Sequence, residues 1–138
     1  MKPIDQAEQQ KMLDLAYAAM EHAYVPYSGF RVGACLKATS GKYYMGCNIE
    51  NAAYTPTNCA ERTAFFKAVY DGEREFDGIA IVCSGKHPAY PCGVCRQVMN
   101  EFCDRNMPIV CANGDRSSVV ASSLAEMLPN GFGPKDLL

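Results

Sequence analysis

Hydrophobic positions recur at helical spacing near the start of the chain. Asp5, with Glu8 three residues later, has the character of a helix N-terminus. The apolar stripe that follows is spaced as on one face of a helix, and it ends before Pro26: Met12, Leu13, Ala16, Ala19, Met20 and Ala23. We therefore predict a first helix over residues 5–23, with this stripe packed into a core.

Strand-like patterns follow this helix. Residues 31–38 and 42–47 flank the turn-forming residues 39–41, which predicts a β-hairpin. The runs 79–83 and 108–112 are short and continuously apolar, as in strands that are buried on both faces. Residues 119–121 predict a further, short edge strand.

Helical patterns separate the later strands. One begins at Cys59 and stops near residues 71–72, and another runs from Cys92 to about Arg105. Ser123 with Glu126 resembles a capping box for a short last helix. Strands that alternate with helices predict an α/β protein, a three-layer α/β/α domain around a mixed five-stranded sheet, in which crossover helices make two or three central strands parallel.

Composition narrows the class of protein. A chain of 138 residues, 49% of them hydrophobic, is expected to form a single domain over residues 1–138. The net charge of −2 argues against a nucleic-acid partner, which usually requires a basic face. No apolar run approaches the ~20 residues of a membrane span, and residues 1–6 do not resemble a signal peptide. We therefore expect a cytoplasmic protein without a nucleic-acid or membrane partner.

Eight cysteines are compatible with either a disulfide framework or reduced thiols. The C-x-x-C spacing of Cys92 and Cys95 is typical of metal sites, and a secretory signal is not evident, so we expect reduced cysteines. Five others lie in or beside apolar patterns and are expected to act as small buried hydrophobes: Cys35, Cys47, Cys83, Cys103 and Cys111.

Two stretches, 57–64 and 91–98, change from turn-like polar sequence to a helical pattern. We expect Asn58 to be an N-cap and Pro91 to lie in a first helical turn. Both helices would then begin with cysteines whose thiolates are stabilised by the helix dipole: Cys59, Cys92 and Cys95.

Three thiolates with a nearby carboxylate suit a catalytic Zn²⁺ site, which keeps three protein ligands, whereas a structural site is closed by four. Zinc lowers the pKa of bound water towards ~7, and Glu61, in the same turn as Cys59, is placed to carry its proton. Arg62 can donate to thiolate sulfur and offset its charge, or form an ordinary surface ion pair.

Two other interpretations of these cysteines are possible, but the sequence lacks a feature that each would require. A redox pair would require a thioredoxin-type unit, which the chain does not offer. A structural zinc site would require a fourth ligand, and none of the candidates has suitable spacing to Cys59: Cys83, Cys103, Cys111, His22 and His87.

The run Cys59-Ala60-Glu61, followed by Pro91-Cys92-Gly93-Val94-Cys95, resembles the three-cysteine form of the zinc nucleobase deaminase signature. Residues 27–34 and 46–54 are similar to the small, homotetrameric cytidine deaminases. This likeness extends from about Leu13 to Leu138.

The resemblance implies a cytidine deaminase-like fold, one Zn²⁺ per subunit, and hydrolytic deamination of cytidine and 2′-deoxycytidine in pyrimidine salvage. It also implies a homotetramer with shared active sites, in which Phe132 enters the pocket of a neighbouring subunit. The other residues that it assigns to the nucleoside are Phe30 against the pyrimidine, Asn48 and Glu50 on the ribose hydroxyls, and Tyr54 and Ala60 in the same pocket.

The residue types alone leave alternatives at these positions. Phe30 can seal a core edge, Asn48 and Glu50 can be solvated or capping residues, and Tyr54 can be a packing residue. For the whole chain, a deaminase of another aminopyrimidine or of a nucleoside antibiotic such as blasticidin S remains open, and so does a zinc-stabilised binding module. An RNA or DNA editing enzyme would require a basic channel, which this acidic chain lacks.

Overall fold

The computed structural model describes residues 1–138. Its helices are α1 (Gln6–Met20), α2 (Ala60–Tyr70), α3 (Gly93–Phe102) and α4 (Leu124–Met127), with a 3₁₀ turn η1 (Pro134–Asp136) near the end. Its strands are β1 (Val32–Ala38), β2 (Tyr43–Cys47), β3 (Phe76–Cys83), β4 (Pro108–Ala112) and β5 (Val119–Ser123).

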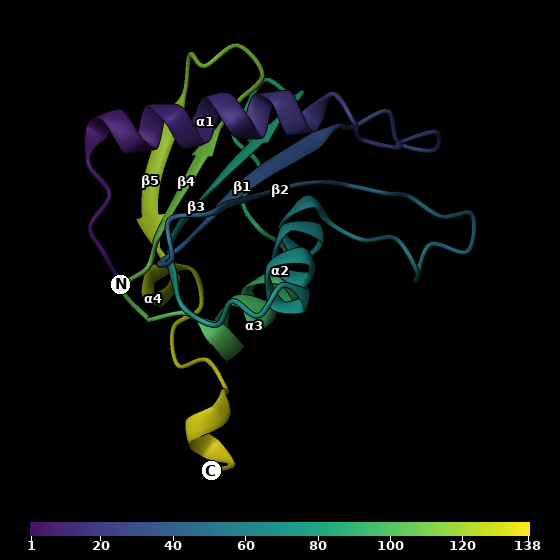
Figure 1. Ribbon diagram of the computed structural model, residues 1–138. Helices are drawn as coiled ribbons and strands as arrows, with labels where there is room; N and C mark the ends of the chain where they lie inside the picture. Colours follow the sequence, from purple (N-terminus) through teal and green to yellow (C-terminus); the bar gives the residue numbers. More distant parts are fainter.

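The five strands form one sheet in the order β2-β1-β3-β4-β5. Only β3 and β4 are parallel, and the other neighbouring pairs are antiparallel. Helix α1 covers one face of this sheet, and α2 and α3 lie side by side on the other (Figure 1). The predicted three-layer α/β/α architecture with a mixed five-stranded sheet is therefore confirmed.

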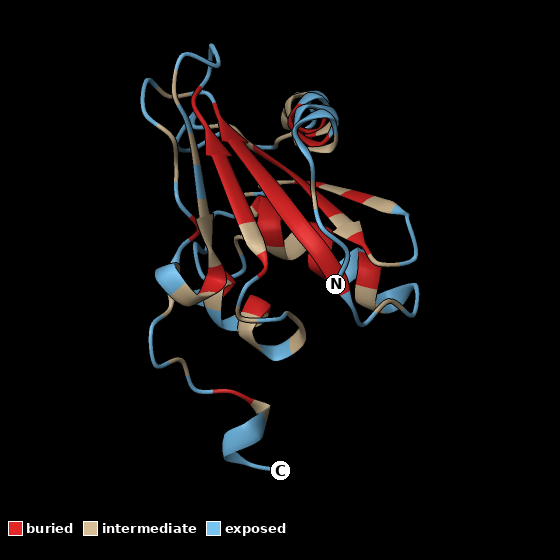
Figure 2. Ribbon diagram, turned by 90° about the vertical axis from the view of Figure 1, so that its left-hand side faces the viewer, coloured by how far each residue is buried: buried red, intermediate tan, exposed pale blue.

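Two apolar layers hold the sheet between its helices. Met12, Leu13 and Ala16 of α1 pack on residues of β1, β3 and β4 that point to that face. A larger cluster on the opposite face joins the sheet to α2 and α3 around Phe65 and Met99. Strand β3 contributes to both layers and is buried along its whole length (Figure 2), which confirms the prediction from its continuous apolar run.

Glycines allow both helix layers to approach the sheet closely. A Cβ atom on Gly46 of β2 would lie 2.2 Å from the carbonyl oxygen of Ala60, in the first turn of α2. A Cβ atom on Gly33 of β1 would lie 2.1 Å from the carbonyl oxygen of Ala16 in α1. The first turn of α2 therefore rests directly on the backbone of β2.

Two predicted boundaries on either side of the sheet were wrong. Helix α1 ends at Met20 because Tyr24 leaves the helical path and donates its N–H to the carbonyl of Asn48 at 3.0 Å. Strand β3 begins at Phe76, three residues before its apolar run, because the buried Asp77 has polar partners that include the Thr39 hydroxyl at 2.9 Å.

Helix α3 is also shorter than predicted, because it ends at Phe102 and Cys103 leaves the helix in an extended conformation. Half of the predicted capping box of the last helix is present, since Ser123 caps α4 and its hydroxyl accepts from the N–H of Glu126 at 3.3 Å. The Glu126 carboxylate accepts from the Ser123 hydroxyl at 3.2 Å rather than from its backbone N–H. None of the helices combines the length and the apolar character needed to span a bilayer.

Candidate active site

The starts of α2 and α3 place the candidate metal-binding cysteines at two helix N-termini, but with different caps from those predicted. Cys59 is itself the N-cap of α2, and the Asn58 side chain donates instead to the Thr63 hydroxyl at 3.0 Å. Cys92 is the N-cap of α3, so Pro91 lies before the helix, where its carbonyl accepts from Arg96 Nε at 2.6 Å. The predictions of Asn58 as a cap and of Pro91 as a first-turn residue were therefore wrong.

As N-cap residues, Cys59 and Cys92 lie at the very ends of their helices. Side chains at N-cap positions lie near the positive end of the helix dipole, although neither cysteine makes a side-chain hydrogen bond to the first backbone N–H groups of its helix. Cys95 lies in the first turn of α3, three residues after Cys92. All three cysteines therefore lie where negative sulfur is stabilised by the backbone.

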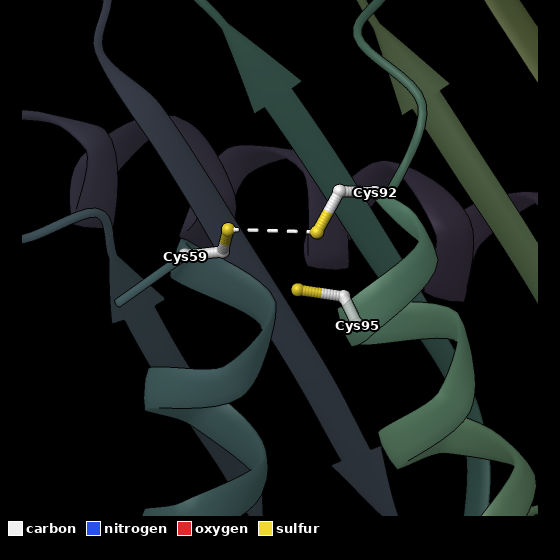
Figure 3. Close-up of side chains that lie close together, drawn as sticks. All are labelled: Cys59, Cys92 and Cys95. Carbon is white, nitrogen blue, oxygen red and sulfur yellow. Dashed lines mark hydrogen bonds between the residues drawn. The ribbon is translucent and has the colours of Figure 1, made fainter. Parts of the chain in front are cut away.

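The three sulfur atoms point toward one another from the starts of α2 and α3 (Figure 3). All three lie within 4.8 Å of one another, and the Sγ atoms of Cys59 and Cys92 are 3.8 Å apart. Tetrahedral zinc with Zn–S bonds of ~2.3 Å requires sulfur atoms about 3.8 Å apart. The donor set therefore fits zinc in both chemistry and spacing.

The cluster contains three candidate ligands and no fourth. The other residues considered as ligands are not part of it: Cys83, Cys103, Cys111, His22 and His87. Cys95 is buried, Cys59 is half-buried and Cys92 is exposed, so the cluster extends from the core to the surface. A set of three protein ligands is typical of catalytic zinc sites rather than structural ones.

Neighbouring donors favour the thiolate form of Cys59. Hydrogen bonding from Cys95 and from Arg62 lowers the pKa of Cys59 to about 5, and the pKa of Cys95 is raised because it shares its proton with Cys59. Arg62 Nη2 lies 3.3 Å from Cys59 Sγ. A divalent cation between the sulfurs would reverse the direction at Cys95, because a coordinated thiol is deprotonated.

Glu61 lies in the first turn of α2, beside these sulfurs. Its side chain is in the protein interior, with 4% of the residue exposed. Burial raises the pKa of Glu61 to about 7, and the negative charge of Cys59 acts in the same direction. A carboxyl group in this setting can both accept and release a proton near neutral pH.

Asn48 and Glu50 lie beside Phe30, and both are already hydrogen-bonded to backbone. Asn48 Oδ1 accepts from the N–H of Val32 at 2.9 Å, and its Nδ2 donates to the carbonyl of Phe30 at 2.8 Å. The Glu50 carboxylate accepts from the N–H groups of Tyr27 and Ser28 at 3.0 and 3.1 Å, and from the Ser28 hydroxyl. Each side chain keeps some capacity for a further partner, because an amide offers two donors and a carboxylate about four lone pairs.

Tyr54 and Ala60 occupy contrasting positions. Tyr54 is exposed in a left-handed conformation, with φ of 62°, and its ring meets Tyr27 edge-on. Both tyrosines line a groove of about 420 Å³ that also contains Glu50. Ala60 is fully buried at the start of α2, next to Cys59.

Phe132 lies between α4 and η1, in the last segment of the chain, which projects from the rest of the domain (Figures 1 and 2). Its side chain is exposed, while its carbonyl accepts from Gln97 Nε2 and Asn100 Nδ2 of α3 at 2.8 and 2.7 Å. The tail is therefore attached to the helix that carries Cys95, with the ring directed to solvent.

Ser28 is a residue of this region that sequence analysis missed. Its hydroxyl donates to Glu50 and accepts from the N–H of Phe30 at 3.0 Å. The only sequence signal was its place in the turn two residues before Phe30, where serine commonly binds backbone. Ser28 joins the candidate ribose contact to the candidate base contact.

The fold and the sulfur cluster define a zinc-binding α/β protein, and comparison with known proteins specifies which kind. Residues 6–111 match the family described as "Cytidine and deoxycytidylate deaminase zinc-binding region". The chain therefore belongs to this deaminase family.

Relatives that carry the name cytidine deaminase align with nearly the whole of this chain. This chain is 50% identical to a cytidine deaminase of Sporosarcina psychrophila, over 93% of both chains. It is 46% identical to a cytidine deaminase of Halalkalibacterium halodurans, over 94% of this chain and 98% of the relative. The crystal structure of a cytidine deaminase from Burkholderia pseudomallei superposes with a TM-score of 0.85 at 44% identity, over 89% of this chain and 98% of the other.

Proposed function

We propose that this protein is a zinc-dependent cytidine deaminase that converts cytidine and 2′-deoxycytidine to uridine and 2′-deoxyuridine and releases ammonia. The observation that carries this proposal is the cluster of three cysteine sulfurs within 4.8 Å of one another, beside the buried Glu61. The activity would serve pyrimidine salvage. Its setting is a reducing cytoplasm, because the cysteines have to remain thiolates to hold a metal.

Cys59, Cys92 and Cys95 would hold the metal. When bound there, zinc supplies the Lewis acidity that makes water a nucleophile near neutral pH. Arg62 donates to Cys59 sulfur at 3.3 Å and so offsets part of the negative charge of three thiolates.

Glu61 moves the protons of the reaction. Its carboxylate accepts a proton from water as the water oxygen adds to C4 of the cytosine ring, and it delivers that proton to N3. It then carries the second proton of the water to the amino group on C4, so that the C4–N bond breaks and ammonia leaves. One water is consumed and one ammonia is released, and Glu61 returns to its starting state.

Residues 28–50 would hold the nucleoside. Phe30 is 41% exposed and offers a ring face for the pyrimidine. Asn48 and Glu50 offer their remaining donor and acceptor capacity to the ribose hydroxyls, while their existing bonds fix the backbone on both sides of Phe30. Tyr54 and Ala60 complete the proposed pocket.

We propose a homotetramer with shared active sites as the working form. The exposed Phe132 on a tail that projects from the domain supports this assembly, because an exposed aromatic ring in such a place suits insertion into a neighbouring subunit. The exposed aromatic residues near the candidate pocket, Tyr27 and Tyr54, are suitable surfaces for such a contact.

The test is conversion of cytidine by the purified chain, followed by the ultraviolet spectral change from cytosine to uracil and by stoichiometric release of ammonia. We expect turnover that a zinc chelator abolishes and that added zinc restores. Zinc-loaded protein that leaves cytidine and 2′-deoxycytidine unchanged would contradict the proposal and would favour a binding module.

A further inference from the structure

Asn113 is a buried polar residue that directly follows strand β4. Only 3% of the residue is exposed. Its Nδ2 donates to the carbonyl of Lys86 at 2.9 Å and to the Ser117 hydroxyl at 2.8 Å, and its Oδ1 accepts from the N–H of Ser118 at 3.0 Å. Its own carbonyl accepts from the Tyr17 hydroxyl of α1. Both amide hydrogens and the amide oxygen are therefore used.

These bonds fix residues 84–87, the loop that follows β3, from one side. Next to Asn113, the N–H of Gly114 donates to the carbonyl of Gly85 at 2.9 Å. From the other side, Arg31 and Ser84 exchange two bonds: Arg31 N–H to Ser84 Oγ at 3.0 Å, and Ser84 N–H to the Arg31 carbonyl at 2.9 Å. The loop 84–87 is thus held between Asn113–Gly114 and the residue that follows Phe30.

The ring of Phe30 rests on this loop. A Cβ atom on Gly85 would lie 3.1 Å from Phe30 Cε1, closer than most Cβ contacts in proteins. The backbone of Phe30 is held independently by Ser28 and Asn48. The loop 84–87 therefore determines how far the ring can turn, while the ribose-side residues determine where its backbone lies.

We propose that Asn113 is a positioning residue for the pyrimidine pocket, which acts by holding the loop 84–87 against the ring of Phe30. This inference rests on the proposed function, in which Phe30 faces the pyrimidine. An asparagine suits the position because two donors and one acceptor are needed there, and an aspartate would set an oxygen against the Lys86 carbonyl without a hydrogen between them.

A positioning role and a purely structural role give different kinetics. If Asn113 only stabilised the fold, its replacement would lower the active fraction, so that the apparent kcat would fall and the KM would stay unchanged. If it positions the pocket wall, the KM for cytidine rises while turnover per bound zinc is maintained, because binding that is equal in the ground and transition states is lost.

The experiment is steady-state deamination of cytidine by zinc-loaded Asn113→Asp and Asn113→Ser, with kcat expressed per bound zinc. We expect the KM to rise about tenfold with kcat within about twofold. Asn113→Ser removes the donor without adding an oxygen near Lys86, so it carries the test if Asn113→Asp does not fold. Ser117→Ala is the matched control, because it removes the other Nδ2 partner, on an exposed residue, and leaves the bond to Lys86; its KM should not change.

Two further variants test the route through the ring. Gly85→Ala adds a Cβ atom that would crowd the ring of Phe30 but not Asn113, so it should raise the KM as well. In a Phe30→Leu background, Asn113→Ser should raise the KM no further, since the group through which it acts is gone. An unchanged KM in Asn113→Ser or Gly85→Ala, or effects that multiply in the double variant, would overturn the inference. Wild-type protein that does not deaminate cytidine would instead refute the proposed function itself.

Discussion

Consecutive residues at the start of α2 meet very different surroundings. Glu61 turns into the protein and loses water, which raises its pKa to about 7. Arg62 reaches back along the helix to Cys59 sulfur. One helical turn therefore combines a cysteine of the zinc cluster, the proposed proton carrier and a neighbouring cation, because side chains that are one residue apart project about 100° apart around a helix.

Glu61→Gln separates proton transfer from metal binding. The amide keeps the size of the side chain but cannot carry a proton, so we expect kcat to fall by at least about 10²–10⁴-fold. Zinc content should remain one per chain. Glu101→Gln, which removes an exposed carboxylate from α3, is the control and should leave both quantities unchanged. Substantial turnover by Glu61→Gln would refute the assignment of Glu61.

The Glu50 carboxylate should titrate below its ordinary range. The Ser28 hydroxyl and the backbone N–H groups of Ser28 and Tyr27 lower the pKa of Glu50. A carboxyl whose pKa is lower in the folded than in the unfolded chain stabilises the fold above the unfolded pKa, and this stabilisation is lost as the pH falls through the folded pKa.

We therefore expect Ser28→Ala to raise the pKa of Glu50 and to reduce the loss of stability that acid causes. Carbon-detected NMR titration of the Glu50 carboxyl measures the first effect, and thermal unfolding at several acidic pH values measures the second. Equal Glu50 titration in the wild type and in Ser28→Ala would show that the hydroxyl contact does not form in solution.

At the scale of elements, the distance between α2 and the sheet determines where Cys59 lies. Gly46 permits the first turn of α2 to rest on β2, and Gly33 permits the same closeness for α1 on the other face. The two glycines occupy neighbouring strands, with Ala34 paired to Gly46 and Gly33 paired to Cys47. They therefore form a matched pair, of which only one touches the helix that carries a metal ligand.

Gly46→Ala should lower zinc affinity, because the added carbon would lie 2.2 Å from the Ala60 carbonyl and would push the first turn of α2 from the sheet. Gly33→Ala should destabilise the fold by a comparable ~1–3 kcal/mol, typical of an overpacked interior, without this effect on zinc. Competition titration with a chromogenic chelator, on protein shown to be folded, compares the two. Equal zinc affinities in the two variants would contradict the account.

The elements that sequence predicted best are those whose signal is local. The apolar runs of β3 and β4 and the Ser123 N-cap are readable within a few residues, and both cysteine stretches coincide with helix starts. The exact cap was not readable, because the choice between Asn58 and Cys59 depends on Thr63, which draws the asparagine side chain away.

Features that depend on remote partners could not be predicted. Asp77 and Gly78 look unlike a buried strand until Thr39 supplies a partner for the carboxylate from 38 residues away. Asn113 looks like an ordinary turn residue in the sequence, because its partner, the carbonyl of Lys86, is 27 residues away along the chain. The cysteine cluster was predictable because a short motif carries it, whereas the network around Phe30 is assembled by the fold.

At the scale of the whole molecule, two of the exposed aromatic side chains, Phe132 and Tyr54, belong to the proposed nucleoside pocket. Phe132 is 58% exposed and Tyr54 is 74% exposed. A pocket that leaves such rings in water is incomplete within one chain. The proposed tetramer would cover them.

Mixing two inactive or impaired variants tests this sharing. Phe132→Ala alone should remain tetrameric by light scattering and should raise the KM for cytidine about tenfold. After subunit exchange with Glu61→Gln, some Phe132→Ala sites should receive an intact Phe132 from the partner variant, so a population of sites with the wild-type KM should appear. A monomer that deaminates cytidine with the wild-type KM would contradict the shared site.

We propose that three sulfurs, and no fourth protein atom, hold a zinc ion beside Glu61. X-ray absorption spectroscopy at the zinc edge, on protein loaded with one equivalent of metal, measures this directly. We expect three sulfur neighbours at ~2.3 Å and one lighter neighbour, with Cys59→Ser reducing the sulfur count by one. Four sulfurs, a histidine nitrogen among the neighbours, or protein that binds no zinc would contradict it.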